Sequence, residues 1–397
     1  MAKRARGLTT IAVHAGERYD PSTGAVGTPI YQNSTFYYPR KPDGRGGWVP
    51  NEDFIYSRYS NPTVQAAEEK FAALEGAESA ICFASGMAAV SASNLAFVKA
   101  GETVVAQANM YGGTIGLFNR EFQRLGIGVK YSWTGAAEDL ASLVDASTRI
   151  VYVEAPSNPF NHIVDLPKLR QLLDRKWGRK RPRILIDATT ASPYNFRPLE
   201  HGADISIHSA TKYLNGHSDI IAGAVAGSNS LMEEIRPWLK SLGGCMDPHQ
   251  AFLLRRGMAT LALRMRRHNE NGVAMARMLA RHRAVETVWH PSLSDHPSHG
   301  LGRRLMKGFG SIVTFQLKTR RAAAARRFFG RLELFAIAAS LGGVESLASL
   351  PLETQYRLTP PTMRKRLGVT PTLIRLALGI EDTDDLLADV TQALRAV

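Results

Sequence analysis

The sequence predicts an α/β protein with a mostly parallel sheet in a large domain and a smaller α+β domain towards the C-terminus. Between residues 79 and 207, short apolar segments alternate with helical segments, which is the pattern of βα units. A long helical segment, Met258–Arg281, ends this alternation, and strands and helices then mix. The chain has 397 residues, 44% hydrophobic and 21% charged, which is enough for one large and one smaller domain.

The elements follow in order along the chain. The residues before about position 60 are rich in Gly, Pro, Tyr and Asn, with an evident loop at 43–47, so we expect an irregular arm there. The strands expected in the large domain are Ala80–Phe83, Thr103–Ala106, Val129–Trp133, Ile150–Glu154, Ile184–Ile186 and Ile205–Ile207. Those expected in the C-terminal domain are Ser311–Leu317, Phe335–Ala339 and Leu373–Ile380. The predicted division is an arm at 1–62, a large domain at 63–257 and a C-terminal domain at 258–397.

The net charge of +14 raises the question of a nucleic-acid partner. The basic residues fall in small groups on the expected solvent faces of helices, and no helix-turn-helix, zinc-finger or RNA-binding motif accompanies them. We therefore expect no nucleic-acid partner, and expect the charge to attract anionic ligands.

The two cysteines, Cys82 and Cys245, cannot form a disulfide framework, which favours a cytoplasmic location. The basic start of the chain is not followed by the apolar core of a signal peptide. No apolar segment approaches the roughly 18 residues of a membrane span, so we expect no membrane partner.

Lys212 is the residue most indicative of function. It follows an expected strand and stands beside two small hydroxyl residues, Ser209 and Thr211, which suits a buried amine able to form an imine. Pyridoxal phosphate is the cofactor whose aldehyde condenses with a lysine. Because an average lysine in such a place is a solvated loop residue, the prediction depends on further groups elsewhere in the chain.

Three segments offer those groups. Asp187 ends an apolar strand, and a carboxylate there would keep a pyridine nitrogen protonated, although Asp187 could equally cap the next turn. Ser85, Gly86 and Met87 follow a strand and open a helix, where free backbone amides bind phosphate, although Ser85 could be a plain helix cap. Tyr111, in a glycine-rich loop, could stack on the ring and move protons, or be an ordinary buried tyrosine.

Two residues of the arm, Tyr56 and Arg58, could bind a phosphate, and Arg58 could equally form a surface ion pair. Readings from other classes are weaker. A metal hydrolase would use His290, His296 and His299, but Asp295 is the one carboxylate near them, and we expect no metal site. A non-catalytic basic binding protein is a remote alternative. No GxSxG or GxGxxG segment supports a serine hydrolase or a dinucleotide enzyme.

Taken together, the segments resemble the Cys/Met-metabolism family of pyridoxal phosphate enzymes, which includes cystathionine γ-synthases, γ-lyases and β-lyases, methionine γ-lyases and O-acylhomoserine sulfhydrylases. The resemblance runs from about His14 to Asp382. Its motifs are Tyr56–Thr63, Ala84–Ala89, Tyr111–Thr114, Ser157–Pro159, Ser209–Asp219 and Ser340–Ser346. It implies the aspartate aminotransferase-like fold type I, the cofactor pyridoxal 5'-phosphate, and a homotetramer of two dimers that share active sites.

The resemblance also implies roles for individual residues. Lys212 matches the Schiff-base lysine, and Asp187 the partner of the pyridine nitrogen. The matches to phosphate ligands are Ser85, Gly86, Met87, Ser209 and Thr211, with Tyr56 and Arg58 donated by the neighbouring subunit. Tyr111 matches the stacking tyrosine, which with Lys212 would be catalytic. The matches around the amino-acid substrate are Arg375, which would anchor its α-carboxylate, with Asn158, Ser340 and Glu345.

The implied reaction is γ-elimination or γ-replacement on a sulfur-containing or O-activated homoserine-type amino acid. A carbon–sulfur β-lyase and an O-acylhomoserine sulfhydrylase remain alternatives. Gly113 stands where methionine γ-lyases carry a reactive cysteine, which argues against that activity. Ile55, Ala188 and Gln355 also depart from the family pattern, so we expect a substrate whose distal end differs from that of cystathionine.

Overall fold

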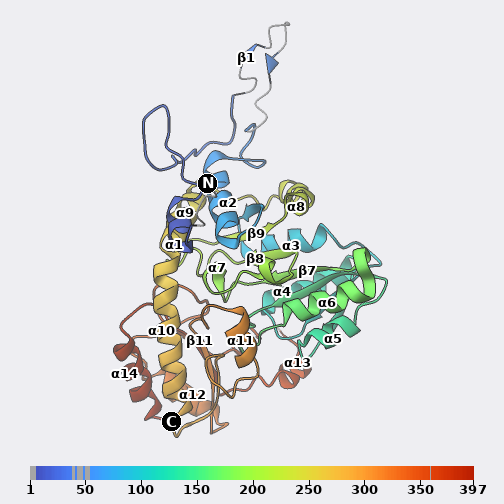
Figure 1. Cartoon of the computed structure of the whole chain (residues 1–397). Helices are drawn as coiled ribbons and strands as arrows, with labels where there is room; N and C mark the ends of the chain where they lie inside the picture. Colours follow the sequence, from blue (N-terminus) through green and yellow to red (C-terminus); the bar gives the residue numbers. More distant parts are fainter. Residues whose placement is uncertain (1–5, 38–40, 43–47, 50–53, 358) are drawn as a thin grey trace.

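The computed structural model describes residues 6–37, 41–42, 48–49, 54–357 and 359–397. The loop expected at 43–47 lies outside these residues. In Figure 1 much of the described chain before the first long helix projects from the end of the molecule opposite the C-terminus. A single short helix in this segment, α1 (Leu8–His14), packs against the body of the protein.

A seven-stranded sheet forms the centre of the larger part of the molecule, in the order β3-β9-β8-β7-β6-β4-β5. The strands are β3 (Ser79–Phe83), β4 (Thr103–Gln107), β5 (Gly128–Ser132), β6 (Thr148–Glu154), β7 (Arg183–Asp187), β8 (Ile205–His208) and β9 (Gly223–Gly227). Every neighbouring pair is parallel except those of β9, which is antiparallel to β3 and β8. The predicted mostly parallel sheet is therefore confirmed.

Strand β9 is the strand of this sheet that the sequence does not predict. It consists of small residues with glycine at both ends, which is a weak strand signal. A β-carbon added at Gly223 would overlap the carbonyl oxygen of Ser85. Glycine is therefore needed here because the turn after β3 lies directly against β9.

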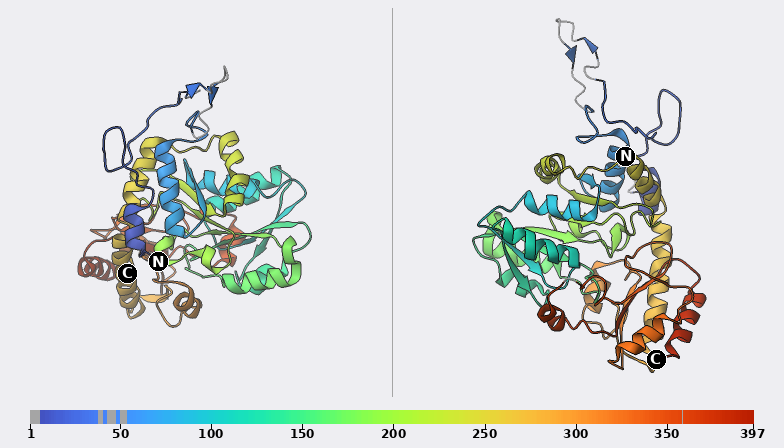
Figure 2. Two further views of the ribbon diagram at one scale, coloured as in Figure 1. Left: turned by 45° about the horizontal axis from the view of Figure 1, so that its top comes forward. Right: turned by 180° about the vertical axis from the view of Figure 1, so that it is seen from behind.

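Both faces of the sheet are covered, so the strands alternate between two buried sets of side chains. One face carries α3 (Gly86–Leu95), η1 (Leu117–Phe122) and α8 (Asn229–Leu242). The other carries α2 (Pro62–Glu75), α5 (Ala137–Ser142), α6 (Leu166–Trp177) and α9 (Pro248–Ala259). Figure 2 shows these layers from two further directions.

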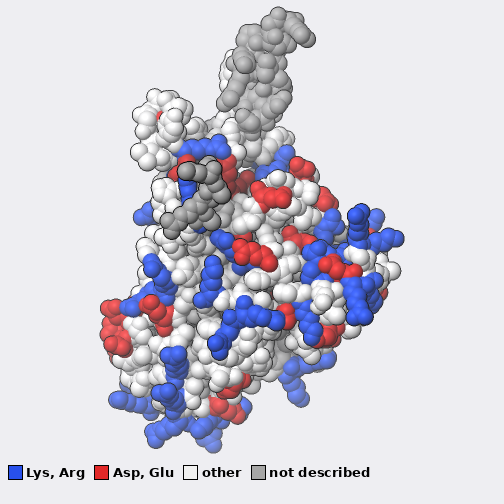
Figure 3. All heavy atoms as spheres, viewed as in Figure 1, with Lys and Arg blue, Asp and Glu red and all other residues white. Residues whose placement is uncertain are grey.

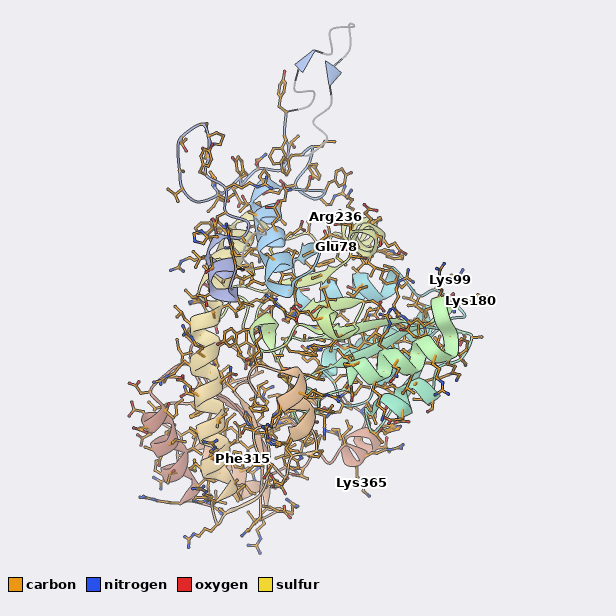
Figure 4. All side chains as sticks on the ribbon, in the orientation of Figure 1. Glu78, Lys99, Lys180, Arg236, Phe315 and Lys365 are labelled. Atoms are coloured by element: carbon orange, nitrogen blue, oxygen red, sulfur yellow. The ribbon has the colours of Figure 1, made fainter. Side chains whose placement is uncertain are left out.

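A five-stranded sheet forms the C-terminal part, in the order β10-β11-β14-β13-β12. Its strands are β10 (Val285–Trp289), β11 (Ile312–Leu317), β12 (Ala336–Ile337), β13 (Leu347–Ser349) and β14 (Leu373–Ala377). Helices α10 (Leu261–Ala280), α12 (Ala322–Phe329) and α14 (Thr383–Leu394) pack on it around a separate core that includes Phe315, labelled in Figure 4.

Two strands predicted here are shorter in the structure. The strand expected at 335–339 is reduced to two residues, and the strand expected at 373–380 ends at Ala377. A β-carbon at Gly379 would overlap the carbonyl oxygen of Val344, so the chain turns closely against another segment there. Strands β10 and β13 are not predicted.

The helix expected at 258–281 is confirmed as α10, which begins at Leu261 and ends at Ala280, and a break at Thr260 separates it from α9. The break follows Gly257, which has no room for a side chain because a β-carbon there would overlap the carbonyl oxygen of Asn215. In Figure 1, α10 runs beside both sheets towards the C-terminus.

The remaining elements are short. They are β1 (Lys41–Pro42), β2 (Trp48–Val49), α4 (Gly112–Gly116), η2 (Gly178–Lys180), α7 (Ser192–Asn195), η3 (Pro198–His201), α11 (His299–Leu305) and α13 (Pro361–Arg366). Within the described ranges, no helix has the length and apolar character that crossing a bilayer requires. Figure 3 shows basic side chains in several groups on the visible face, with acidic side chains among them.

Candidate active site

A cavity of about 680 Å³ opens where the carboxyl ends of the parallel strands meet the C-terminal sheet. It is lined by residues that follow five strands of the large sheet and by residues of the C-terminal part; those used below are Ser85, Gly86, Tyr111, Glu154, Asn158, Asp187, Ser209, Thr211, Lys212, Ser340, Gln355 and Arg375. Ligand sites of open α/β sheets lie at this edge, and the volume suits a small-molecule ligand.

Lys212 lies on the loop after β8 with its amine in the cavity. Its Nζ donates a hydrogen bond to Oγ of Ser340 over 2.6 Å. Burial, and then the positive charge of Arg375, lower the pKa of the Lys212 ammonium to about 8. A substantial fraction of this amine is therefore neutral near physiological pH.

The loop that carries Lys212 is fixed from behind by Arg264, a buried residue of α10. Its guanidinium donates to the carbonyl oxygens of Tyr213 over 2.7 Å, Leu214 over 3.3 Å and Gly257 over 2.7 Å. Gly216, with φ of +75°, leaves the space that this guanidinium occupies. The amine is thus presented by a rigid turn.

Asp187 and Glu154 are two buried carboxyl groups at paired positions on β7 and β6. Asp187 accepts a hydrogen bond from the backbone nitrogen of Thr189 over 3.0 Å. Burial raises the pKa of Asp187, while the bonds from Thr189 and the nearby His208 oppose that rise. Burial and repulsion by Asp187 raise the pKa of Glu154 well above its ordinary value. A cationic group in the cavity would stabilise the ionised form of this pair.

Ser85 caps α3, since its Oγ accepts a hydrogen bond from the backbone nitrogen of Ala88 over 3.1 Å. Ser85 both caps α3 and lines the cavity, so its interpretations as a helix cap and as a phosphate-binding residue are compatible. A β-carbon at Gly86 would lie 2.9 Å from Cβ of Ser209, and this close approach brings the helix N-terminus and the lysine loop together. The hydroxyl of Thr211 is already engaged by the backbone of Ala222.

Tyr111 precedes α4, and its ring is 45% exposed at the cavity wall. The backbone nitrogen of Tyr111 donates to Oε2 of Glu154 over 2.6 Å, and the backbone nitrogen of Asn158 donates to Oε1 over 2.7 Å. The ring lies so close to Gly113 that a β-carbon there would overlap it. Glu154 and Gly113 together therefore determine where the tyrosine ring lies.

Arg375, on β14, is buried in the opposite wall. It donates to Oδ1 of Asn158 over 3.3 Å, to Oε1 of Gln355 over 3.0 Å and to the carbonyl oxygen of Ser340 over 2.7 Å. Burial lowers its pKa to about 10. A buried guanidinium with neutral acceptors is suited to an anionic ligand.

Three candidate residues lie elsewhere. Arg58 donates to the carbonyl oxygen of Lys240 over 2.7 Å and, with Tyr56, belongs to the arm rather than to the cavity wall. Glu345 accepts a hydrogen bond from Oγ of Ser218 in an adjoining hollow that shares Thr211 and Ser340 with the cavity. Met87, by contrast, lines the cavity as expected.

The three residues that depart from the family pattern lie in different places. Ile55 lines a hollow beside Arg58, and Ala188 is fully buried, so neither side chain lines the cavity. Gln355 does, and it reaches the arginine end of the cavity. Its Oε1 accepts a hydrogen bond from Arg375 over 3.0 Å, and its association with a distal substrate group stays a prediction.

Glu154 is a site residue that the sequence reasoning missed. It is the last residue of an expected strand, so its position at the ligand edge of a parallel sheet was the available signal. Thr189 was missed as well; its Oγ1 accepts a hydrogen bond from the backbone nitrogen of Ser209 over 2.8 Å and links the aspartate turn to the lysine loop.

The three histidines of the metal-hydrolase alternative each contact a backbone carbonyl: His290 that of Gly310, His296 that of Phe160 and His299 that of Pro291. Among the described residues, no group of three or more His, Cys, Asp or Glu side chains could hold a metal ion.

The cavity fits pyridoxal phosphate in each part that the structure describes. It combines a half-buried amine, a buried carboxyl pair, a helix N-terminus at Gly86 that lies against the lysine loop, and an aromatic ring at the wall. Such a fold and such a site define a pyridoxal phosphate-dependent enzyme.

Comparison with known proteins identifies the family. Residues 9–395 match the family model described as Cys/Met metabolism PLP-dependent enzyme. The L-methionine γ-lyase of Pseudomonas deceptionensis is 39% identical over 394 residues, 98% of each chain. The cystathionine γ-lyase of Bacillus subtilis (strain 168) is 39% identical over 389 residues, 98% of this chain and 99% of the relative.

A solved structure shares the fold over nearly its whole length. It is the cystathionine γ-synthase from Xanthomonas oryzae pv. oryzae in complex with aminoacrylate and cysteine, which is 35% identical with a TM-score of 0.92 over 99% of this chain and 98% of that chain. This chain belongs to the Cys/Met metabolism family of PLP-dependent enzymes and has their fold type I architecture.

Proposed function

We propose that this enzyme catalyses γ-elimination or γ-replacement on a sulfur-containing or O-activated homoserine-type amino acid. The observation that carries the proposal is that Lys212, an amine with a pKa of about 8, lines one cavity with a buried carboxyl pair and a buried arginine. Relatives named as γ-lyases and γ-synthases, at 39% identity over nearly the whole chain, support this choice of reaction.

Each residue of the cavity has a place in this reaction. When bound, pyridoxal phosphate takes up the electrons left at the substrate Cα. Asp187 would keep the pyridine nitrogen protonated, and Lys212 Nζ would remove the Cα proton and return protons to the substrate. The hydroxyl of Tyr111 transfers a proton at the γ leaving group, which departs as a thiol or an acid. Arg375 binds the substrate carboxylate, with Asn158 beside it.

The backbone amides of Gly86 and Met87, with the hydroxyl of Ser209, would hold the phosphate. We propose that Tyr56 and Arg58 complete this site from a neighbouring subunit, because they precede α2 and do not line the cavity of their own chain. We further propose a cytoplasmic homotetramer of two dimers, with residues 1–62 as the shared arm, 63–257 as the cofactor domain and 258–397 as the C-terminal domain.

The distal part of the substrate is less polar than that of cystathionine in this proposal. The cavity wall also includes the apolar residues Val90, Ile221 and Leu341, with Glu353 and Arg357 as charged residues. Glycine at position 113 leaves room for the Tyr111 ring, which any side chain there would displace. The site should therefore differ from those of methionine γ-lyases, in which the family resemblance puts a cysteine at this position.

Product analysis tests the proposal. The purified enzyme, loaded with pyridoxal phosphate, is incubated with cystathionine, O-acylhomoserines, homocysteine and methionine, with and without thiols. Release of 2-oxobutanoate indicates γ-elimination, and a new thioether indicates γ-replacement. Pyruvate as the main product from cystathionine would contradict the proposed reaction. Turnover of cystathionine in preference to less polar substrates would contradict the proposal of a less polar distal substrate group.

A further inference from the structure

Glu75 and His208 form a buried pair of titratable side chains in the large domain. Glu75 is 0% exposed and His208 is 1% exposed, and Oε1 of the glutamate lies 2.6 Å from Nε2 of the histidine. Neither residue lines the cavity, and neither takes part in the proposed reaction. Burial of an ionisable side chain is costly unless it is paired, so this pair calls for an explanation.

Glu75 does not stabilise the helix that carries it. It is the last residue of α2, whose last turn has no basic residue, so its carboxylate lies at the negative end of the helix dipole. Its other oxygen, Oε2, is buried and has no hydrogen-bond partner among the described residues. Within the described part of the chain, the ion pair of Glu75 is with His208 alone. The glutamate is therefore explained by what it does to the histidine.

The contact between the two side chains is typical of a charged pair. A distance of 2.6 Å is shorter than the usual N–H···O separation of about 2.9 Å, and hydrogen bonds between charged groups are the shorter ones. Because an imidazole holds a proton more tightly than a carboxylate does, Nε2 of His208 is the donor and Glu75 the acceptor. The ring of Phe71, also on α2, lies edge-on to the histidine at 5.3 Å and covers it.

His208 lies directly behind the carboxyl group of Asp187. Asp187 is paired with Ile207 on the neighbouring strand, and the backbone nitrogen of Ala188 donates to the carbonyl oxygen of Ile207 over 3.0 Å. His208 is the next residue, so its ring points to the opposite face of the sheet, where α2 packs. Burial raises the pKa of Asp187, and the bonds from Thr189 and then the charge of His208 oppose that rise.

We propose that Glu75 is a positioning residue for the cofactor, because it holds a positive charge on His208 and this charge keeps Asp187 ionised towards the ring nitrogen. The proposal rests on the role of Asp187 in the proposed function. Asp187 and Glu154 repel each other at the cavity, and a fixed cation behind the sheet offsets part of that repulsion. Glu75, His208 and Asp187 then form a row of alternating charge that leads to the ring nitrogen.

A cofactor analogue without the ring nitrogen tests this role through binding and not turnover. Pyridoxal 5'-phosphate and 1-deazapyridoxal 5'-phosphate, which has a C–H group in place of that nitrogen, are titrated into the full-length protein freed of cofactor. The cofactor absorption band gives the dissociation constant of each. Wild type is expected to prefer pyridoxal phosphate, because Asp187 can pair only with a ring that carries a proton on nitrogen. Glu75→Gln should reduce this preference about 10-fold by weakening pyridoxal phosphate alone.

Glu68→Gln is the matched control. Glu68 is another acidic residue of α2, but it pairs with Arg236 over 3.2 Å and accepts a hydrogen bond from the backbone nitrogen of Cys82 over 3.0 Å. Its preference between the two ligands should equal that of wild type. His208→Gln removes the charge from the other side of the pair, so it should lose the preference to a similar extent, and it replaces Glu75→Gln if that variant does not fold.

The two ligands share their phosphate and aldehyde, so a general loosening of the site would weaken both. Equal weakening of both ligands, or an unchanged preference, in the Glu75 and His208 variants would overturn the role of Glu75 alone. A wild-type protein that binds both ligands equally would overturn the role of Asp187 in the proposed function as well.

Discussion

Lys212 and Ser340 are joined by a hydrogen bond of 2.6 Å between Nζ and Oγ, although they lie 128 positions apart in the chain. Ser340 also accepts a hydrogen bond at its carbonyl oxygen from Arg375 over 2.7 Å. Its backbone has φ of +100°, which is unfavourable for a residue with a side chain. The proposed base and the proposed carboxylate anchor are therefore held by one strained residue.

Two substitutions separate the strain from the hydrogen bond. Ser340→Ala removes the acceptor of Lys212 and keeps the strain, and we expect it to lower kcat about 10-fold. Ser340→Gly also removes the acceptor but relieves the strain. Its free energy of unfolding should therefore be about 1 kcal/mol higher than that of the alanine variant. Steady-state kinetics and urea unfolding measure the two effects. Equal stability of the two variants would contradict the strain.

The pH dependence of covalent cofactor capture follows from the pKa of Lys212. Only the neutral amine attacks an aldehyde, and the pKa is lowered to about 8, so the rate should rise with pH and reach half its maximum near pH 8. Arg375→Gln removes a nearby positive charge and should move this midpoint upwards. Stopped-flow absorption after mixing cofactor-free protein with pyridoxal phosphate measures both. A wild-type midpoint near the ordinary lysine value of 10.5 would contradict the burial of the amine.

Gly113 should be essential for the position of Tyr111. Gly113→Ala places a methyl group inside the space of the ring, so we expect kcat to fall at least about 10-fold with little loss of stability. Gly116→Ala, on the same helix α4, is the control, because its β-carbon would meet only the end of the Arg120 side chain at 3.4 Å. Kinetics and thermal unfolding of both variants give the comparison. Equal activity of the two would show that the ring has room to move.

The lysine turn can be tested in the same way. Gly216→Ala combines an unfavourable positive φ with overlap of the Arg264 guanidinium, whereas Gly243→Ala has a similar φ of +73° and open space around it. We expect the control to cost about 1 kcal/mol and Gly216→Ala about 2 kcal/mol more, with loss of cofactor binding. Chemical unfolding and cofactor titration are the measurements. Equal losses of stability would mean that Arg264 does not fix the turn.

Much of the site could be predicted from the sequence, because Ser85, Asp187 and Lys212 each follow an apolar strand and parallel strands bring their carboxyl ends to one edge. The order of the strands in the sheet could not be predicted in this way. Strand β9 has no strand signature, and its glycine at 223 is explained only by the neighbouring turn at Ser85.

Other features depend on contacts between distant segments. Glu154 acts through the backbone nitrogens of Tyr111 and Asn158, which a pattern of side chains does not reveal. The contact between Gln355 and Arg375 is not evident from the sequence, because it depends on packing of the Gln355 backbone against Gly112. For Tyr56 and Arg58, the proposed site needs a second subunit, so a single chain does not bring them to the cavity.

The central claim is that Lys212 carries the cofactor in this cavity. The most direct measurement is borohydride reduction of the loaded enzyme followed by peptide mass spectrometry, on wild type and on Lys212→Ala. The label should be found on Lys212 in wild type and be absent from the variant, whose far-ultraviolet circular dichroism should remain that of wild type. A reducible bond that survives in Lys212→Ala, or a label on another lysine of the wild type, would contradict the account.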